Sequence, residues 1–333
     1  MKNISTAIVC MAANENLYIR DFVKWHLKLG FTKIFIGDNS PVDGEHPDFI
    51  LNDFIDSGQV EIIRLYKHHR NPQFLQMIFY SVVYELYHHL FDWMFFIDVD
   101  EFVMFINNGN FTNVSEWLSQ DYIANADEIR LNWLCFGDND QLYYDNRPVW
   151  KRFPKPMPDL LKNDWCGDYP INETLKSAIR CTSSFANFIA TSSPHWALTD
   201  KQSDSVVITP SGKRLNWNSS IGTIDYEIAC LAHYRTLTVT EFLRKRFGKQ
   251  FGAQATGAIY SKDTYLKQFT TENEMTPEKQ AIWDAYLENF ESEHPGIFDQ
   301  ENLVNVLQPT DDELNKYIQD VYAAVINEKE WTY

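Results

Sequence analysis

Two aspartates that follow an apolar run have the residue type and spacing of a metal site. Residues 93–97 read WMFFI and predict a buried strand, and Asp98 and Asp100 come directly after it. Two carboxylates inside a buried strand would lose their hydration at a large cost in free energy. At the strand end they can face a crevice and bind a cation, and hard oxygen ligands favour Mn²⁺ or Mg²⁺. The pattern therefore predicts a metal site, with an acidic turn that lacks chemistry as the alternative.

Imidazole groups further along the chain could complete this site. His195 and His233 both follow the aspartates, and either could add a nitrogen ligand to a carboxylate site. Pro194 holds the backbone before His195 extended, which suits a fixed ligand, whereas His233 lies in an apolar run typical of packed structure. The sequence favours His195 as the third metal ligand and leaves His233 as the competing candidate.

Two basic residues could neutralise an anion near the same place. Lys176 and Arg180 lie four positions apart in the chain, between the aspartates and His195. The protein carries a net charge of −17, so an anionic ligand needs local positive charge from such side chains or from a divalent ion. Pairing of both residues with surface carboxylates is the alternative interpretation.

Strands and helices alternate in the region that must position these residues. Strands are predicted at 7–13, 33–37, 60–65 and 93–97, and helices at 15–29 and 73–90. This order predicts an α/β fold with a mostly parallel sheet, whose ligands bind at the carboxyl ends of the strands. Helical patterns follow at 241–246, 277–290 and 310–327. We predict a catalytic domain over 1–235 and a helical C-terminal extension over 236–333.

Composition excludes several classes of protein. No long run of Lys or Arg offsets the net charge of −17, which argues against nucleic acid as a partner. Five cysteines without a CxxC pair indicate a reducing compartment rather than disulfides or zinc. No stretch reaches the ~20 apolar residues of a transmembrane helix. We therefore expect a cytoplasmic protein, at most peripheral to the inner face of the membrane.

Several motifs occur in the order found in one group of enzymes. They are Asn14-Glu15, the segment FIGDNS at 35–40, Gln76, the segment FIDVDEF at 96–102, and HYR at 233–235. With these motifs the chain resembles bacterial glycosyltransferases of the family 2-like and family 92-like group, from residue 7 to about residue 250. The resemblance implies a GT-A type fold, with a mixed, mostly parallel sheet flanked by helices. It also implies metal-dependent transfer of a hexose from a nucleotide-sugar donor, UDP being the expected nucleotide.

The resemblance implies roles for individual residues. The first strand-end loop, with Ala12, Ala13 and Glu15, and the acidic end of the second strand, Asp38, hold the nucleotide. Asp98 and Asp100 bind the cation and the diphosphate, and a later histidine, here His195, closes the metal shell. The predicted donor-binding set also includes Gln76, Lys176 and Arg180. The sequence departs from the group at Ala13, where a lysine is common, and at 138–140, where small residues are common.

An inverting reaction also needs a carboxylate base near the acceptor hydroxyl. Asp138 is the first candidate because it follows a strand predicted at 128–133, although the segment DND at 138–140 is equally typical of a turn. Asp140, Asp225 and Glu227 are the alternatives. The expected acceptor is a glycan, a lipid-linked oligosaccharide or a glycoprotein in bacterial polysaccharide biosynthesis.

Two other classes compete with a glycosyltransferase. A haloacid dehalogenase-type phosphatase also places a DxD after an apolar strand, and the segment GDND at 137–140 resembles its late acidic motif. Its nucleophile, however, lies on the first strand, whereas this DxD follows the fourth predicted strand. A non-catalytic carbohydrate-binding protein would account for 10 Trp, 17 Tyr and 23 Phe, because aromatic rings pack on sugars.

Overall fold

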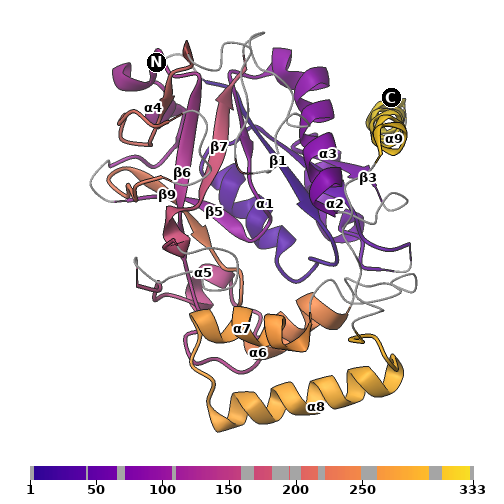
Figure 1. Ribbon diagram of the computed structural model, residues 1–333. Coiled ribbons are helices and arrows are strands. Elements are labelled where there is room, and N and C mark those ends of the chain that lie inside the picture. Colours follow the sequence, from indigo (N-terminus) through magenta and orange to yellow (C-terminus); the bar gives the residue numbers. More distant parts are fainter. Residues whose placement is uncertain are drawn as a thin grey trace.

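The computed structural model describes residues 4–42, 44–65, 72–106, 110–158, 169–181, 195, 204–216, 222–248, 261–299 and 310–330. The described strands form one nine-stranded sheet in the order β3-β2-β1-β4-β7-β6-β9-β5, with β8 beside β6. Helices lie against both faces of this sheet (Figure 1). The predicted α/β class is confirmed.

The first half of the sheet is parallel. Its strands are β1 (Thr6–Ala12), β2 (Lys33–Asp38), β3 (Val60–Arg64) and β4 (Trp93–Phe96). β1 pairs in parallel with β2 and β4, and β2 pairs in parallel with β3. The four predicted strands are thus confirmed to within a residue at each end. Their carboxyl ends meet at one edge of the sheet, where parallel sheets bind ligands.

The second half of the sheet mixes both directions. Its strands are β5 (Glu101–Phe105), β6 (Glu128–Cys135), β7 (Leu175–Arg180), β8 (Val207–Ile208) and β9 (Ala229–His233). β7 runs antiparallel to β4 and β6, and β5 runs antiparallel to β9. β8 and β9 both run parallel to β6. The sheet is therefore mixed and mostly parallel, as expected.

Alternation of side chains along β1 divides the core into two layers. Ile8 and Cys10 face the layer of α1 (Ile19–Lys28) and α2 (Asp48–Asp56). Ala7 and Val9 face the opposite layer, which holds α3 (Pro72–Tyr87) and α9 (Asp311–Glu330). Because both faces are covered, these strands are apolar throughout instead of alternating with polar residues.

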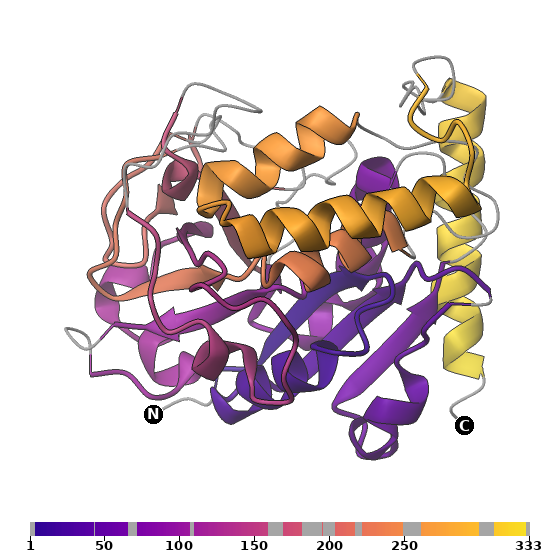
Figure 2. The same cartoon turned by 90° about the horizontal axis from the view of Figure 1, so that it is seen from below.

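Three of the remaining helices form a group of their own. α6 (Val239–Leu243), α7 (Lys262–Glu272) and α8 (Pro277–Glu293) surround an apolar cluster that includes Phe242, Phe269 and Trp283. A π-helical turn, Arg244–Gly248, continues α6. These helices lie together beyond one end of the sheet, while α9 packs on α3 (Figures 1 and 2). The helices predicted at 277–290 and 310–327 are confirmed as α8 and α9.

Several short elements were not expected. They are α2, α4 (Val114–Leu118), α5 (Val149–Arg152) and α7. α5 interrupts a segment, 147–161, that reads as a long loop in sequence, and positions 159–161 lie outside the described residues. Among the described residues, no helix combines the length and apolar character needed to cross a bilayer.

Candidate active site

The two aspartates lie in the short connection between β4 and β5. Glu101, the first residue of β5, accepts a hydrogen bond from the Asp98 amide at 2.9 Å and donates its own amide to the Asp98 carbonyl at 3.0 Å. These two bonds close a tight turn. The Asp98 and Asp100 side chains remain 33% and 15% exposed, whereas the Glu101 side chain is fully buried. The turn therefore presents two carboxylates and hides the third.

A lysine neutralises each exposed carboxylate. Lys176 on β7 lies 2.9 Å from Asp98 Oδ2, and Lys245 on the π turn lies 2.8 Å from Asp100 Oδ2. Burial alone would raise the pKa of both carboxyls. The ammonium groups reverse this effect, so the pKa of Asp98 falls below its ordinary value and the pKa of Asp100 falls well below it. Both aspartates are therefore ionised at neutral pH.

Helix α3 adds an amide to the same site. Gln76 donates through Nε2 to Asp98 Oδ1 at 2.6 Å, and the same nitrogen lies 2.7 Å from the Tyr80 hydroxyl. Tyr80 is fully buried and thus fixes the amide against the turn. The predicted contact of Gln76 with the donor site is consistent with this position beside Asp98.

Both candidate histidines lie near the aspartates. The β5–β9 ladder places His233 opposite Glu101, and His233 Nε2 lies 3.5 Å from Asp100 Oδ1. His195 Nδ1 lies 3.1 Å from the Leu175 carbonyl at the start of β7. Trp133 joins the two, with ring centroids 4.2 Å from His233 and 5.4 Å from His195. The position of His233 follows from strand pairing, which the sequence pattern does not reveal.

The protonation states of the two rings suit metal ligands. Burial and the nearby Lys176 ammonium outweigh the opposing effect of Asp98 and together lower the pKa of His195 to about 3. Burial also lowers the pKa of His233. Both rings are therefore neutral at pH 7, the state in which imidazole binds a metal. The Leu175 carbonyl can only accept, so His195 Nδ1 carries the proton and Nε2 carries the lone pair.

The donor atoms of this turn are of the chemical type that divalent cations prefer. Within the described part of the chain, no three His, Cys, Asp or Glu side chains already surround a common point. Mg²⁺ sites commonly use only one or two protein carboxylates and complete their shell with substrate phosphates and water. Two ionised carboxylates in one turn, with neutral imidazole nearby, provide such a partial shell. Asp98, Asp100 and His195 are therefore chemically suited to the predicted role.

Hydrogen bonds join the loop that follows β1 to the loop that follows β2. The Ala12 carbonyl at the end of β1 accepts the Asn39 amide at 2.8 Å, and Asn14 Oδ1 accepts the Glu45 amide at 2.9 Å. Asn14 has a φ of 56°, a left-handed conformation that asparagine tolerates. The connection between β2 and α2 is thus tied to the connection between β1 and α1. The predicted nucleotide-binding segments lie side by side.

Asp38, predicted to contact the nucleotide, is fully buried at the end of β2. Its Oδ1 accepts the Ser40 amide at 3.0 Å, and its Oδ2 lies 2.6 Å from His46 Nδ1 and 3.6 Å from Arg64. Burial lowers the pKa of His46, but its hydrogen bonds to Asp38 and to the Val42 carbonyl outweigh this, so the pKa is raised overall. In this conformation Asp38 orders the β2–α2 loop, and both of its charged partners, His46 and Arg64, are partly exposed.

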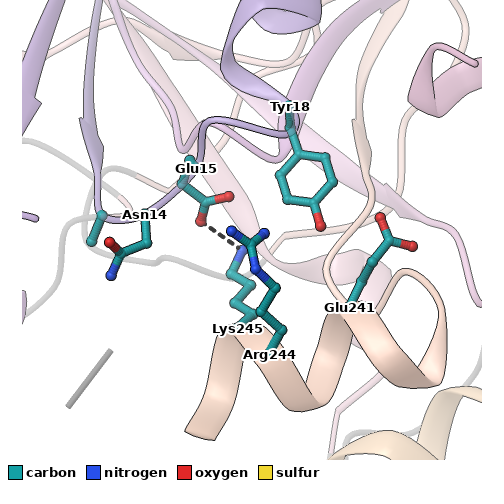
Figure 3. Close-up of a pocket in the computed structure, with 7 residues that line it drawn as sticks. Asn14, Glu15, Tyr18, Glu241, Arg244 and Lys245 are labelled. Carbon is teal, nitrogen blue, oxygen red and sulfur yellow. Dashed lines mark ion pairs between the residues drawn. The ribbon is translucent and has the colours of Figure 1, made fainter. Parts of the chain in front are cut away.

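A pocket lies between the first strand-end loop and the C-terminal helices. Its lining is Ala13, Asn14, Glu15, Tyr18, Glu241, Arg244 and Lys245. Lys245 bridges Glu15 at 3.3 Å and Asp100 at 2.8 Å, so the pocket adjoins the aspartate turn. The Tyr18 hydroxyl points toward the Glu241 carboxylate (Figure 3). Glu241 is held by a buried bidentate pair with Arg152, at 2.8 and 2.9 Å.

Two residues predicted for the site, Arg180 and Asp138, form contacts with residues other than Asp98 and Asp100. Arg180 lies opposite Trp93 at the far end of β7, where it donates to the Ala126 and Ile123 carbonyls and stacks over the Trp93 ring. Asp138 follows β6 and forms a buried ion pair with Lys279 of α8 at 2.7 Å. Burial raises the pKa of Asp138. The structure thus brings Lys176 to the aspartates and leaves Arg180 at the opposite end of the strand.

The alternative bases occupy different environments. Asp225 is buried and accepts hydrogen bonds from the Thr209 and Ser211 hydroxyls. Glu227 is exposed and pairs with Lys213 at 2.7 Å, and the Asp140 side chain is 86% exposed. The Asp225 carboxylate is therefore occupied by hydrogen bonds within the protein, whereas the Asp140 carboxylate is accessible to a substrate.

Comparison with known proteins completes this description. Residues 5–284 match the family model described as glycosyltransferase family 92. The chain is therefore a glycosyltransferase. This match rules out the two alternatives considered from the sequence, a phosphatase and a non-catalytic carbohydrate-binding protein. The chain belongs to glycosyltransferase family 92. No curated protein matches the sequence.

The chain is also similar to crystal structures of S. aureus TarS. For the fragment TarS 1-349 the identity is 12%, the chains are covered to 99% and 92%, and the TM-score is 0.34. The same fragment in complex with UDP gives the same identity and coverage with a TM-score of 0.36, and its complex with UDP-GlcNAc gives 0.34. Against a longer TarS chain, at 13% identity, this protein covers 54% of that chain.

Proposed function

We propose that this glycosyltransferase moves a hexose from a UDP-sugar to a glycan, lipid-linked or glycoprotein acceptor and depends on Mn²⁺ or Mg²⁺. The observation that carries the proposal is the aspartate turn, which joins two ionised carboxylates, two neutral histidines and the pocket of the first strand-end loop. The family match supplies glycosyl transfer, and the choice of UDP and of a hexose rests on the family resemblance.

Asp98, Asp100 and His195 would hold the ion, which when bound stabilises the negative charge that develops on the departing nucleoside diphosphate. Gln76 fixes the orientation of Asp98, and Trp133 packs the histidines into one arrangement. Ala12, Ala13, Glu15 and Asp38 are the proposed nucleotide contacts. The carboxylates of Glu15 and Asp38 suit the hydroxyl and N–H donors of a nucleoside better than they suit a phosphate.

Asp138 remains the proposed base. The acceptor oxygen forms the new bond to the anomeric carbon, its proton passes to the carboxylate, and the pair of electrons of the broken bond stays with the diphosphate. The raised pKa of Asp138 favours proton acceptance. Lys279, 2.7 Å away, would stabilise the ionised form before the transfer.

A panel of nucleotide sugars tests the proposal. Each is incubated with the full chain and Mn²⁺, and release of the nucleoside diphosphate is measured with and without EDTA. We expect release from a UDP-hexose that EDTA abolishes. Release from GDP- or CMP-sugars alone would refute the UDP assignment, and equal release in EDTA would refute the metal requirement.

A further inference from the structure

Two adjacent cations line the pocket beside the aspartate turn. Arg244 and Lys245 open the π turn that follows α6, and both side chains face the loop that carries Asn14 and Glu15 (Figure 3). Both side chains are partly exposed, Arg244 to 29% and Lys245 to 16%. Glu15 and Glu241 line the same pocket, and Arg244 pairs with Glu45, so each cation is held beside a carboxylate with which an anionic ligand would compete.

The cations expected from sequence to meet an anion are less suitable. Lys176, 2.9 Å from Asp98 and 3.8 Å from Glu101, is fully buried and out of reach of a ligand, whereas the Lys245 side chain is 16% exposed. Arg180 lies at the far end of β7. Among the described basic residues near the turn, Lys245 alone contacts one of its aspartates and also lines the pocket.

Lys245 pairs with two carboxylates that are themselves proposed to bind the metal ion and the nucleotide. Its ammonium lies 2.8 Å from Asp100, a proposed metal ligand, and 3.3 Å from Glu15, a proposed nucleotide contact. A divalent ion on Asp100 would repel the ammonium and weaken this ion pair. An ammonium group carries three donors, so Lys245 can then turn to a new acceptor in the pocket.

We propose that Lys245, assisted by Arg244, binds the diphosphate of the donor, and that Asp100 and Glu15 hold this lysine in place before the donor arrives. This inference rests on the proposed function, because the diphosphate is that of the nucleotide sugar. It moves the anion-binding role from Lys176 and Arg180 to the π turn. Lys245 thereby stabilises the leaving group directly, while Lys176 keeps Asp98 ionised.

Binding of three probes tests the inference without turnover. UDP, uridine and inorganic pyrophosphate are titrated calorimetrically in Mn²⁺ into the full chain and into Lys245→Met. Loss of one charge-assisted contact is expected to weaken UDP and pyrophosphate by about 10- to 100-fold, and uridine by less than threefold. Arg244→Gln should weaken the same two probes by a smaller factor. Equal UDP affinity in the wild type and Lys245→Met would overturn the inference.

Two further variants control for folding and for charge. Glu15→Gln combined with Lys245→Met removes the Lys245–Glu15 ion pair, and its loss of pyrophosphate affinity relative to Glu15→Gln alone tests the same contact if Lys245→Met alone does not fold. Lys213→Met removes a lysine that pairs with Glu227 outside the pocket, and it should leave all three affinities unchanged. A Lys176→Met variant that loses UDP affinity while Lys245→Met retains it would return the role to Lys176.

The outcomes separate this inference from the proposed function. If UDP binds the wild type but Lys245→Met binds it equally well, the inference fails and the function stands. If pyrophosphate binds in a Lys245-dependent manner but no UDP-sugar is turned over, the inference stands and the UDP assignment fails. If neither UDP nor pyrophosphate binds the wild type, the inference is refuted together with the nucleotide donor.

Discussion

Replacing Asp100 by asparagine removes one charge from the aspartate turn and changes almost no volume. If Asp100 is a ligand of the ion, the substitution weakens electrostatic stabilisation of the leaving group. The loss of such an interaction costs about 3 kcal/mol or more in the transition state, roughly a hundredfold in rate. We therefore expect Asp100→Asn to lose at least a hundredfold in turnover.

The same substitution has a cost in stability that follows from Lys245. Removing one partner of a buried ion pair costs about 3–5 kcal/mol when the other charge is left alone. Lys245 keeps Glu15 at 3.3 Å, so the expected loss in the free energy of unfolding is smaller, about 1–3 kcal/mol. For a chain of 333 residues this corresponds to a fall in Tm of roughly 1–4 °C.

The assay compares turnover and thermal unfolding in one preparation. Release of UDP from the preferred donor is measured at 25 °C, where the variant stays folded, and Tm is recorded by circular dichroism. Asp92→Asn is the matched control, because Asp92 precedes β4 and accepts hydrogen bonds from Ser5 at the opposite end of the strand. Turnover of Asp100→Asn within threefold of the wild type would refute the assignment of Asp100 as a ligand.

Three further outcomes are expected. His195→Ala should raise the Mn²⁺ concentration for half-maximal activity much more than His233→Ala, which should lower stability or donor binding; the reverse ranking would pass the ligand role to His233. Because burial lowers the pKa of His26 to about 3 from about 6.5 in the unfolded chain, its neutral form stabilises the fold above pH 6.5 and this contribution is lost as pH falls toward 3; the slope of unfolding free energy against pH should be shallower in His26→Gln. Arg152→Met should cost about 3–5 kcal/mol in denaturant unfolding because Glu241 stays buried without its partner, and Arg152→Met combined with Glu241→Gln should recover part of that loss; an unchanged midpoint in the single variant would contradict the reasoning.

The parallel half of the sheet could be predicted because its signals are local. Each strand there is a short apolar run with both faces buried, and Asp98 and Asp100 mark the end of the fourth run. The position of the acids at the strand end follows directly from this pattern. The metal-binding role of the acids stays a prediction.

In the mixed half of the sheet the sequence predicts only β6, as the strand at 128–133, and the other strands could not be predicted because their residues contradict local rules. Lys176 is a charged residue in a strand that is otherwise buried, and its burial is tolerated only because Asp98 and Glu101 lie within 4 Å. The four-residue spacing to Arg180 suggested two cations acting together. In a strand that spacing separates the two Cα atoms by about 13 Å, which explains why only Lys176 reaches the turn.

Lys245 was missed as a site residue for a different reason. Its partners Glu15 and Asp100 lie far away in the chain, and a π-helical turn has no recognisable pattern in sequence. His46 was missed because its partner, Asp38, was assigned wholly to the nucleotide. Pairing of distant charges depends on tertiary structure, which periodicity and spacing do not encode.

The order in which the chain is synthesised has a consequence for the aspartate turn. Lys176 follows Asp98 by 78 positions, and Lys245 follows Asp100 by 145 positions. Contacts between such distant positions form only after the intervening chain has closed into a loop. During synthesis, Asp98 and Asp100 therefore leave the ribosome long before Lys176 and Lys245. Until these lysines are present, burying the two carboxylates is unfavourable because their charges are not paired. We therefore expect this edge of the sheet to consolidate late, because an incomplete chain that ends before the π turn lacks the lysine that pairs with Asp100.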